Sequence, residues 1–507
     1  MLAGFALTCA GHHTYDPARQ IPPDVPRIMN MSPTNFVLAR PTDAAPLARP
    51  RTPRAHLVGI GGAGMRALAD ILDAAGWRIS GSDLNRESMS GSRFDVRAGH
   101  QADAIDAALD WVVYSDAVPA ANPELRRARQ LGLPTLSYPQ VLGRLMDSRA
   151  GVAVAGTHGK STTTAMTAEI LTAGGFDPTV VCGAAPIGKS SGGQLGRGRW
   201  IVAEACEYRE NFRHLKPQMA AILGIEADHF DCFGSPAELE QAFAHFAAAL
   251  PPEGFLLVRA DCAATARSIT GIECPSESFG FGPAATWRAT DLRERRGLYS
   301  FRIRCRERLV CDVKLCVPGR HNVSNALAAA ALASHCGATG TAIRGGLERF
   351  AGLVRRLEWI GEHREIAILD DYAHHPTAVA ASLATVRQMY PERRLWCVFE
   401  PHQVSRTRHL LDEFARSLQN ADKIIVAEIF RAREAREESG EVTAAQLAAR
   451  AAALGSDVVQ LASAAEIEDH LNHSLRPGDV LVTIGAGDIG RVAHDLDQGF
   501  RTFRQAG

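Results

Sequence analysis

The sequence has few lysines, almost no net charge and no long apolar run. Only five of its 55 basic residues are lysines, at positions 160, 189, 216, 314 and 423. The 55 basic residues are balanced by 56 acidic ones, which leaves no overall positive field for nucleic acid. No apolar run reaches the roughly 18 residues that a membrane span requires. We therefore expect neither nucleic-acid binding nor membrane insertion.

The eleven cysteines form no C-x-x-C pair, and the two closest are Cys311 and Cys316. No cluster of cysteine and histidine completes the ligand set of a structural zinc site. Scattered cysteines in odd number are typical of buried free thiols in a reducing compartment. We therefore expect a cytoplasmic protein.

Length and local pattern predict three α/β domains. At roughly 150 residues per domain, 507 residues make three domains and a remainder. Residues 1–52 are rich in Pro, Ala, Thr and Arg without a strand or helix period, which predicts a flexible leader. Beyond them, strands alternate with helices, which predicts parallel sheets in domains at 53–148, 149–352 and 353–507. Residues 275–317 alternate with period 2 and predict an antiparallel insertion.

The first glycine motif follows a predicted strand at 56–60 and precedes a predicted helix at 65–75. Its glycines are Gly59, Gly61, Gly62 and Gly64, and they fit G-x-G-x-x-G. Asp83 ends the next predicted strand. The arrangement is typical of loops whose backbone N–H groups approach a nucleotide diphosphate. A purely structural turn and an NAD-dependent dehydrogenase are the alternatives for this motif alone.

The second glycine motif is a shortened P-loop. It consists of Gly156, Thr157, His158, Gly159, Lys160 and Ser161, and Thr162 opens the predicted helix behind it. The full pattern needs a glycine at position 154, where this chain has Val154, but the shorter form keeps the parts that bind phosphate. Small residues let the backbone wrap the phosphates, Lys160 supplies a positive charge, and the Ser161 hydroxyl suits Mg²⁺. We therefore expect ATP with Mg²⁺ at this loop.

Two strand ends near the P-loop carry possible metal ligands. Glu204 ends a predicted strand at 200–204, and Mg²⁺ prefers such carboxylate oxygens. His229 follows another predicted strand, at 219–225, and is a possible ligand of a second metal, with Asp228 orienting it. A structural role is the alternative for His229.

Further polar side chains in the second half of the chain follow predicted strands, such as those at 366–369 and 395–399, or lie at the start of a helix predicted at 325–333. They are Asn322, Asn325, Arg355, Arg356, Asp370, Asp371, His374, His375, His402 and Arg406. Because ligands of open α/β sheets bind at the carboxyl ends of strands, these side chains are candidates for one site. Helix capping is the simpler role for Asn322, and the residues at 370–375 equally suit a metal pair.

Together, these motifs resemble those of the Mur ligase family of peptidoglycan synthesis. The resemblance covers residues 54–495. It is carried by GIGGAGM, SGSD, AGTHGKSTT, VAEACEYRENF, IEADHFD, PGRHNVSNALAA, VRRLE, DDYAHHPT, FEPHQVSRT and IGAGDIG, in that order. It implies an α/β fold with a Rossmann-like N-terminal UDP-binding domain, a central P-loop ATPase-type domain with an antiparallel β insertion, and a Rossmann-like C-terminal domain that binds the amino acid.

The resemblance also implies the reaction. ATP, with Mg²⁺ at two expected positions, converts the carboxylate of UDP-N-acetylmuramate to an acyl phosphate, which L-alanine attacks, and ADP and phosphate are released. A ligase of the same family that joins a tripeptide is a close alternative, and EACEYRENF followed by HLKP favours the enzyme that adds one amino acid. A non-catalytic UDP-sugar-binding module or regulatory ATPase is a further alternative. Such a protein would be expected to have lost some of Lys160, Glu204 and His229, but all three are present. The P-loop and the metal acids count against a dehydrogenase.

The resemblance assigns a role to each matching residue. The phosphates of ATP are held by residues 156–162, its adenine by Asn322 and Asn325, and its ribose or γ-phosphate region by Asp370 or Asp371. Ser161 and Glu204 bind the Mg²⁺ at ATP, and His229 binds a second metal. The UDP diphosphate lies at Gly59, Gly61, Gly62 and Gly64, the nucleoside at Asp83, and the phosphates of this substrate near Arg356. The expected catalytic residues are Lys160, Glu204 and His229, with His375 and Arg406 at the amino acid and the muramyl end.

Some positions depart from the family pattern. Ser161 stands where the family usually has Thr, which keeps the hydroxyl group. Residues 223–224 are Leu-Gly where Thr-Asn is common, so an amide contact is lost. Glu400 and Gln403 stand where Gln and Arg are common, which changes the charge expected in the amino-acid pocket. The stretch at 83–100 is short, which predicts a trimmed UDP pocket.

Overall fold

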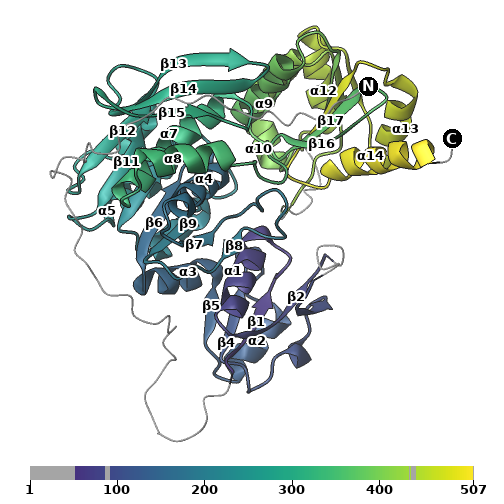
Figure 1. The fold of residues 1–507 in the computed structure, drawn as a ribbon. Coiled ribbons are helices and arrows are strands. Elements are labelled where there is room, and N and C mark those ends of the chain that lie inside the picture. The colour runs from purple at the N-terminus through teal and green to yellow at the C-terminus, as the bar shows by residue number, and fades with distance from the viewer. Residues whose placement is uncertain (1–51, 86–91, 433, 435–440, 506–507) are drawn as a thin grey trace, which may run out of the picture. The chain divides into compact units, whose positions relative to one another are not determined.

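The computed structural model describes residues 52–85, 92–432, 434 and 441–505, with side chains as far as residue 501 (Figure 1). All of these belong to one compact unit, Phe36–Gly507. The predicted leader lies outside the described residues, apart from Thr52. No helix in the described part is long and apolar enough to cross a membrane. Ten cysteines are described and all are free thiols as predicted. Only Cys182, Cys274, Cys336 and Cys397 are buried, whereas four others are half-buried and Cys206 and Cys316 are exposed.

The first sheet has five parallel strands in the order β3-β2-β1-β4-β5. Its strands are β1 (Arg54–Val58), β2 (Arg78–Asp83), β3 (Asp95–Ala98), β4 (Trp111–Tyr114) and β5 (Thr135–Ser137). Its helices are α1 (Ala63–Ala74), the short η2 (Ala102–Ala104), α2 (Pro123–Gln130) and α3 (Tyr138–Asp147). Helix α1 buries Met65, Leu68 and Leu72 on one face, because residues three and four apart lie on the same side of a helix. Asn122 caps α2 by accepting the N–H groups of two of its first residues.

The second sheet has ten strands in the order β15-β14-β13-β12-β11-β10-β6-β9-β7-β8. The strands are β6 (Ala150–Ala155), β7 (Thr179–Val181), β8 (Gly193–Gln194), β9 (Trp200–Glu204), β10 (Met219–Ile222), β11 (Phe255–Arg259), β12 (Ser276–Gly280), β13 (Trp287–Arg295), β14 (Leu298–Cys305) and β15 (Arg308–Lys314). The helices are α4 (Lys160–Ala173), η3 (Tyr208–His214), α5 (Pro236–Ala248), α6 (Ala263–Ser268), α7 (Arg320–His335) and α8 (Gly340–Arg349).

The predicted antiparallel insertion is smaller than expected. Strands β13, β14 and β15 form an antiparallel meander and lie side by side in Figure 1. Strand β12 pairs in parallel with both β11 and β13, so it extends the parallel sheet. Alternation of period 2 identifies strands but not the direction of their neighbours, which explains the error at 275–280.

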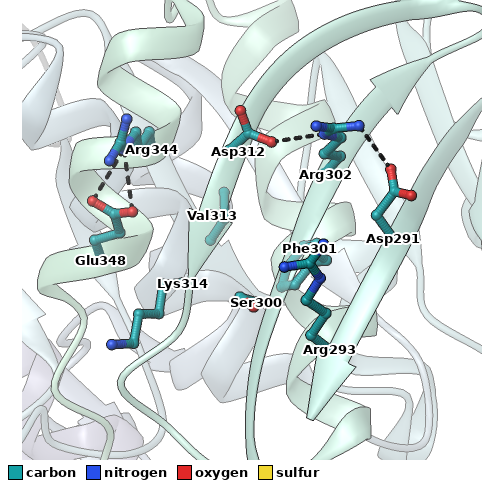
Figure 2. A pocket seen from close by; sticks show the side chains of 10 residues that line it. All are labelled: Asp291, Arg293, Ser300, Phe301, Arg302, Asp312, Val313, Lys314, Arg344 and Glu348. Carbon is teal, nitrogen blue, oxygen red and sulfur yellow. Dashed lines mark hydrogen bonds and ion pairs between the residues drawn. The ribbon is translucent and has the colours of Figure 1, made fainter. Parts of the chain in front are cut away.

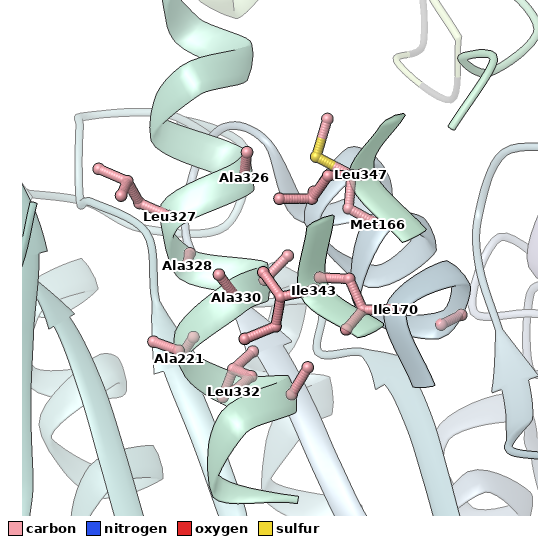
Figure 3. Packing of buried hydrophobic residues seen from close by; sticks show 14 of the residues in the cluster. Met166, Ile170, Ala221, Ala326, Leu327, Ala328, Ala330, Leu332, Ile343 and Leu347 are labelled. Carbon is pink, nitrogen blue, oxygen red and sulfur yellow. The ribbon is translucent and has the colours of Figure 1, made fainter. Parts of the chain in front are cut away.

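Helix α7 lies at the centre of the largest hydrophobic cluster. Figure 3 shows its alanines and leucines packed beside Met166 and Ile170 of α4 and Ile343 and Leu347 of α8. Because this helix is apolar around its circumference, it is buried on nearly all sides. Alanine side chains are short, which lets α4 and α8 approach it closely.

The third sheet has six strands in the order β16-β17-β21-β18-β19-β20, and only the edge pair β16–β17 is antiparallel. The strands are β16 (Glu358–His363), β17 (Ile366–Asp371), β18 (Leu395–Phe399), β19 (Lys423–Val426), β20 (Val458–Gln460) and β21 (Val480–Ile484). The helices are α9 (Pro376–Met389), α10 (Val404–His409), α11 (Leu411–Ser417), η4 (Leu418–Asn420), α12 (Ala444–Ala453), α13 (Ala464–Ser474) and α14 (Gly490–Gln505). Cys397 and Phe399 of β18 belong to one hydrophobic cluster and Trp396 and Val398 to another, so helices cover both faces.

The predicted fold class is confirmed, and each sheet lies within one of the predicted ranges. The exact boundaries at 148 and 352 stay predictions. One hydrophobic cluster contains residues of both the first and the second sheet, so buried contacts continue across the first boundary. The strand predicted at 219–225 ends at Ile222, two residues before Gly224, whose φ of +138° departs from extended strand geometry. The helix predicted at 325–333 begins at Arg320.

Candidate active site

The first glycine loop joins β1 to α1. Gly59 has a φ of +80°, a conformation that favours glycine. The Gly61 N–H donates a hydrogen bond of 2.8 Å to the carboxylate of Asp83 at the end of β2, so two predicted residues meet. A Cβ atom on Gly64 would lie 2.9 Å from the Tyr138 hydroxyl. Gly62 caps α1 without a side-chain hydrogen bond, which leaves N–H groups of the first turn for an anion.

The shortened P-loop joins β6 to α4, and α4 begins at Lys160 with Ser161 and Thr162 in its first turn. Gly156 has a φ of +128° and Gly159 a φ of +81°. A Cβ atom on Gly156 would lie 2.9 Å from the backbone nitrogen of residue 223, and one on Gly159 would lie 2.4 Å from Oδ1 of Asn325. The loop therefore needs glycine at both positions, and α7 lies directly against it.

Lys160 is held over its own loop by three oxygen atoms. Its ammonium group donates to the carbonyl oxygens of Gly156 at 2.6 Å and Thr157 at 3.3 Å, and to Oε1 of Glu207 at 3.0 Å. The side chain of Glu207 is 1% exposed. Burial alone would raise the pKa of Glu207, but Lys160 and His229 outweigh it and lower this pKa to about 2. An ionised carboxylate therefore lies beneath the P-loop lysine.

Glu207 is the main residue that the sequence analysis missed. It lies three residues after Glu204 in the same motif, and that proximity was the only signal available. Its importance depends on contacts with Lys160, 47 positions away, and His229, 22 positions away. Spacing along the chain does not show such contacts.

Glu204 and Ser161 flank the segment at 182–183. Glu204 ends β9 in register with Val154 of β6, and its carboxylate accepts a hydrogen bond from the Gly183 N–H. Ser161 is buried, and its carbonyl oxygen accepts from the Cys182 thiol. A carboxylate and a hydroxyl beside the P-loop fit the oxygen ligands that Mg²⁺ prefers. Their role as ligands stays a prediction.

His229 fits the second predicted metal position. Its backbone is left-handed, with a φ of +54°, and its Nε2 lies 3.2 Å from Oε1 of Glu207. Its Nδ1 is buried and has no hydrogen-bond partner among the described residues. A buried ring nitrogen without a partner suits a metal ligand, because imidazole coordinates through a nitrogen lone pair.

Thr157 and His158 contact the segment that follows β10. The Glu226 N–H donates to Oγ1 of Thr157 at 2.9 Å. The Glu226 carboxylate lies 3.3 Å from Nε2 of His158 and 3.6 Å from Nδ1 of His375. Burial would raise the pKa of Glu226, but the neighbouring His158, Thr377 and His375 lower it to about 2. Glu226 therefore connects His158 of the P-loop with His375, the residue that the resemblance assigns to the amino acid.

Arg406 lies in a buried ion pair with Asp228, and its guanidinium also contacts Nδ1 of His402 at 2.8 Å. Burial would raise the pKa of Asp228, but Arg406 and His229 hold it well below its usual range. Arg406 thus reaches the motif that contains His229. Its contact with a substrate stays a prediction.

The predicted adenine-binding residues lie where α7 meets the P-loop. Asn322 donates to the carbonyl oxygen of Pro318 at 2.7 Å and accepts from Asn325 at 3.0 Å. The N-terminal cap of α7 is Gly319, so the simpler capping role considered for Asn322 is wrong. Adenine contact stays a prediction.

Both acids at the end of β17 accept hydrogen bonds from other groups of the protein. Asp370 is fully buried and accepts from Nε of Arg355 at 2.9 Å. Asp371 accepts from the backbone N–H groups of Leu357 and Ala373, and burial raises its pKa to about 6. The guanidinium of Arg356 lies 4.7 Å from the centre of the Tyr372 ring. The predicted ATP and UDP-substrate contacts of these residues stay predictions.

Gln403 is buried and Glu400 is half-buried, and each of these two residues has a buried side-chain atom that is unsatisfied. Oε2 of Glu400 and Nε2 of Gln403 have no hydrogen-bond partner among the described residues. Burial, followed by the charge of Asp488, raises the pKa of Glu400 to about 7. The stretch at 83–100 includes residues 86–91, which lie outside the described part.

A groove of about 320 Å³ on the β13–β15 meander and α8 lies apart from these residues. Figure 2 shows Arg302 paired with Asp291 and Asp312, and Arg344 paired with Glu348. Its lining contains none of the predicted site residues. The candidate active site is therefore the P-loop region and not this groove.

Three family models match the chain. They are described as the Mur ligase family catalytic domain, at residues 54–150, the Mur ligase middle domain, at 154–333, and the Mur ligase glutamate ligase domain, at 355–487. A UDP-N-acetylmuramate–L-alanine ligase of Burkholderia ambifaria is 40% identical over 455 residues, which cover 87% of this chain and 97% of the relative. The enzyme of the same name from Acetivibrio thermocellus is 37% identical over 445 residues, covering 86% and 94%.

Two solved structures are also similar to this chain. The UDP-N-acetylmuramate–alanine ligase of Thermotoga maritima matches with a TM-score of 0.76 and 26% identity, covering 89% of this chain and 99% of that one. A murein peptide ligase of Psychrobacter arcticus matches with a TM-score of 0.68 and 25% identity, covering 88% and 98%. The motifs, the P-loop geometry and the extent of these matches lead to one conclusion: the chain belongs to the Mur ligase family.

Proposed function

We propose that this protein is an ATP-dependent ligase that joins L-alanine to the carboxylate of UDP-N-acetylmuramate in the synthesis of peptidoglycan precursors. The reaction would take place in the cytoplasm. The observation that carries the proposal is the cluster of Lys160, Glu207 and His229 beneath the P-loop. The names of the relatives that match over nearly their whole length support the choice of substrates.

The reaction has two chemical steps. A carboxylate oxygen of the sugar substrate attacks the γ-phosphorus of ATP, the bond to the β,γ-bridging oxygen breaks, and ADP leaves. The amine of L-alanine, having lost a proton, then attacks the carbonyl carbon of the acyl phosphate, and phosphate leaves from the tetrahedral intermediate. Both steps need the reactants to be aligned and negative charge to be neutralised.

The residues of the P-loop region suit these needs. We expect the N–H groups of residues 156–161 to surround the phosphates and the ammonium group of Lys160 to neutralise charge at the γ-phosphate. Ser161 and Glu204 would hold one Mg²⁺ and His229 a second. Mg²⁺ bound there would supply further neutralisation of phosphate charge. Glu207 keeps Lys160 protonated and oriented, because its ionised carboxylate accepts one of the ammonium hydrogens.

A murein peptide ligase is the second candidate, because a structure with that title matches most of the chain. One assay separates the two functions. Phosphate release is measured with UDP-N-acetylmuramate, Mg-ATP and either single amino acids or the tripeptide L-Ala-γ-D-Glu-diaminopimelate. Release with L-alanine supports the proposal, whereas release with the tripeptide alone would replace it with the second candidate.

Lys160→Ala tests the site itself. The variant should lose turnover but still bind UDP-N-acetylmuramate, since the charge that it removes acts on ATP. Lys216→Ala is a matched control, because Lys216 is exposed and paired with Asp147, and it should keep full activity. Retained turnover in Lys160→Ala would refute the assigned role.

A further inference from the structure

Two histidines and a carboxylate meet at one point outside the cluster of Lys160, Glu207 and His229. His158 belongs to the P-loop, Glu226 follows β10, and His375 caps the N-terminus of α9. One ligand atom of each residue lies within 4.8 Å of the other two, and no metal ion is present in the structure. The three residues come from segments 68 and 149 positions apart along the chain (158 to 226 and 226 to 375), so they meet only in the folded protein.

The separations suit a single cation. Oε2 of Glu226 lies 3.3 Å from Nε2 of His158 and 3.6 Å from Nδ1 of His375. Ligands at 2.0–2.2 Å from a tetrahedral Zn²⁺ are about 3.3–3.6 Å from one another, so these two separations already fit. The two imidazole nitrogens lie within 4.8 Å of each other, so they would need to approach by at most roughly 1 Å.

The ring of His375 has one nitrogen bound to a backbone carbonyl and presents the other near Glu226. Its Nε2 faces the carbonyl oxygen of Ala227 at 3.3 Å, and its Nδ1 accepts the N–H of Thr377 at 3.3 Å. The proton of the neutral ring is therefore assigned to Nε2. The single lone pair of Nδ1 accepts the Thr377 N–H, so coordination of a metal by Nδ1 would replace this hydrogen bond. Metal-binding histidines usually donate their other ring N–H to a carbonyl or a carboxylate in this way.

The carboxylate is also held in place. Oγ1 of Thr377 donates to Oε2 of Glu226 at 2.6 Å. The side chains of His158 and Glu226 are about one third exposed, at 32% and 37%, whereas that of His375 is 8% exposed. An ion can therefore enter from solvent without unfolding of the loop.

We propose that His158, Glu226 and His375 form a binding site for one Zn²⁺-class divalent cation. Two imidazoles and one carboxylate favour Zn²⁺ and Co²⁺ over Mg²⁺, which prefers oxygen ligands. The ion would connect the P-loop to the N-terminus of α9, and its fourth ligand would be water. Metal binding at this site is inferred from the positions of the three side chains, so it can be tested independently of the ligase reaction.

The test is Co²⁺ binding to the full chain without nucleotide, followed by visible absorption, with Zn²⁺ as competitor. The wild-type protein should bind Co²⁺ with nitrogen and oxygen ligands, and Zn²⁺ should displace it. Glu226→Gln keeps the shape of the side chain but removes its charge, and should weaken binding at least tenfold. His158→Gln should do the same.

Two controls separate this site from other sources of binding. Asp469→Asn changes an exposed carboxylate 3.4 Å from His473, a pair that joins no candidate metal group among the described residues, and it should bind like the wild type. His229→Gln removes the ligand that we assign to the catalytic metal, and it should also keep Co²⁺ binding. The proposal is overturned if the wild type does not bind, if Glu226→Gln binds like the wild type, if His229→Gln abolishes binding, or if the spectrum shows thiolate ligands.

Discussion

Arg406 and Asp228 form a buried ion pair between segments 178 positions apart, with 2.7 Å between Nε and Oδ1. The two side chains are 2% and 5% exposed. The same Asp228 oxygen accepts the backbone N–H of His229 at 2.7 Å. Arg406, on α10, therefore helps to fix the loop from which His229 approaches Glu207.

Asp228→Asn should destabilise the protein strongly. Removing one partner of a buried ion pair leaves the other charge uncompensated, which costs about 3–5 kcal/mol. Urea denaturation followed by circular dichroism measures the change. Asp261→Asn is the control, because its pair with Arg259 is largely exposed and should be worth less than about 1 kcal/mol. Equal effects of the two substitutions would contradict this account of the Arg406–Asp228 pair.

Glu207→Gln should impair catalysis more than binding of the UDP substrate. The substitution removes the negative charge that Lys160 and His229 share, so we expect kcat/KM for ATP to fall at least about tenfold, or 1.4 kcal/mol. Steady-state phosphate release measures it. Glu210→Gln, in the same segment but on a more exposed side chain paired with Arg213, should stay near the wild-type value. An unchanged kcat/KM in Glu207→Gln would show that Glu207 is only structural.

Gly159→Ala should disrupt the P-loop. Gly159 has a φ of +81°, and a Cβ atom there would lie 2.4 Å from Oδ1 of Asn325. We expect a large loss of ATP affinity by calorimetry and a loss of roughly 1–3 kcal/mol in stability, which is the usual cost of backbone strain. Gly175→Ala is a matched control, because Gly175 has a φ of +77° with nothing within 4 Å of the added Cβ atom. ATP affinity should survive that substitution, and a similar loss in both variants would rule out a specific clash with Asn325.

Glu400→Gln should change how stability depends on pH. The pKa of Glu400 is raised from 4.5 to about 7 in the folded protein, so between these values the folded state holds a proton that the unfolded chain has lost. The contribution of Glu400 to stability is therefore present below pH 4.5 and is lost as the pH rises through 7. Glutamine stays neutral, so the variant should gain up to about 3 kcal/mol over the wild type between pH 5 and 8, at about 1.4 kcal/mol per pKa unit.

The Glu400 prediction is checked by urea denaturation at pH 5 and pH 8. Glu392→Gln, on an exposed side chain, is the control and should leave the difference between the two pH values unchanged. A pH dependence for Glu400→Gln that matches the wild type would mean that the carboxylate is ionised in the folded protein.

Several features were predicted correctly from local sequence alone. The strands at 200–204 and 395–399 lie where the apolar runs predicted them. The P-loop was identified because its chemistry requires particular residue types at neighbouring positions. The direction of β12 was missed, since alternation along one strand contains no information about its partner.

The sequence by itself determined the α/β class, the two glycine loops and the strand-end motifs, because backbone conformation and side-chain period act over a few residues. Only the tertiary structure decided that Glu207 lies under Lys160, that Arg406 pairs with Asp228, and that His158 and His375 meet at Glu226. Those relationships are distances between remote segments. Burial also decides the charge of Glu400, since the free energy of an ionised carboxylate depends on the groups that replace water around it.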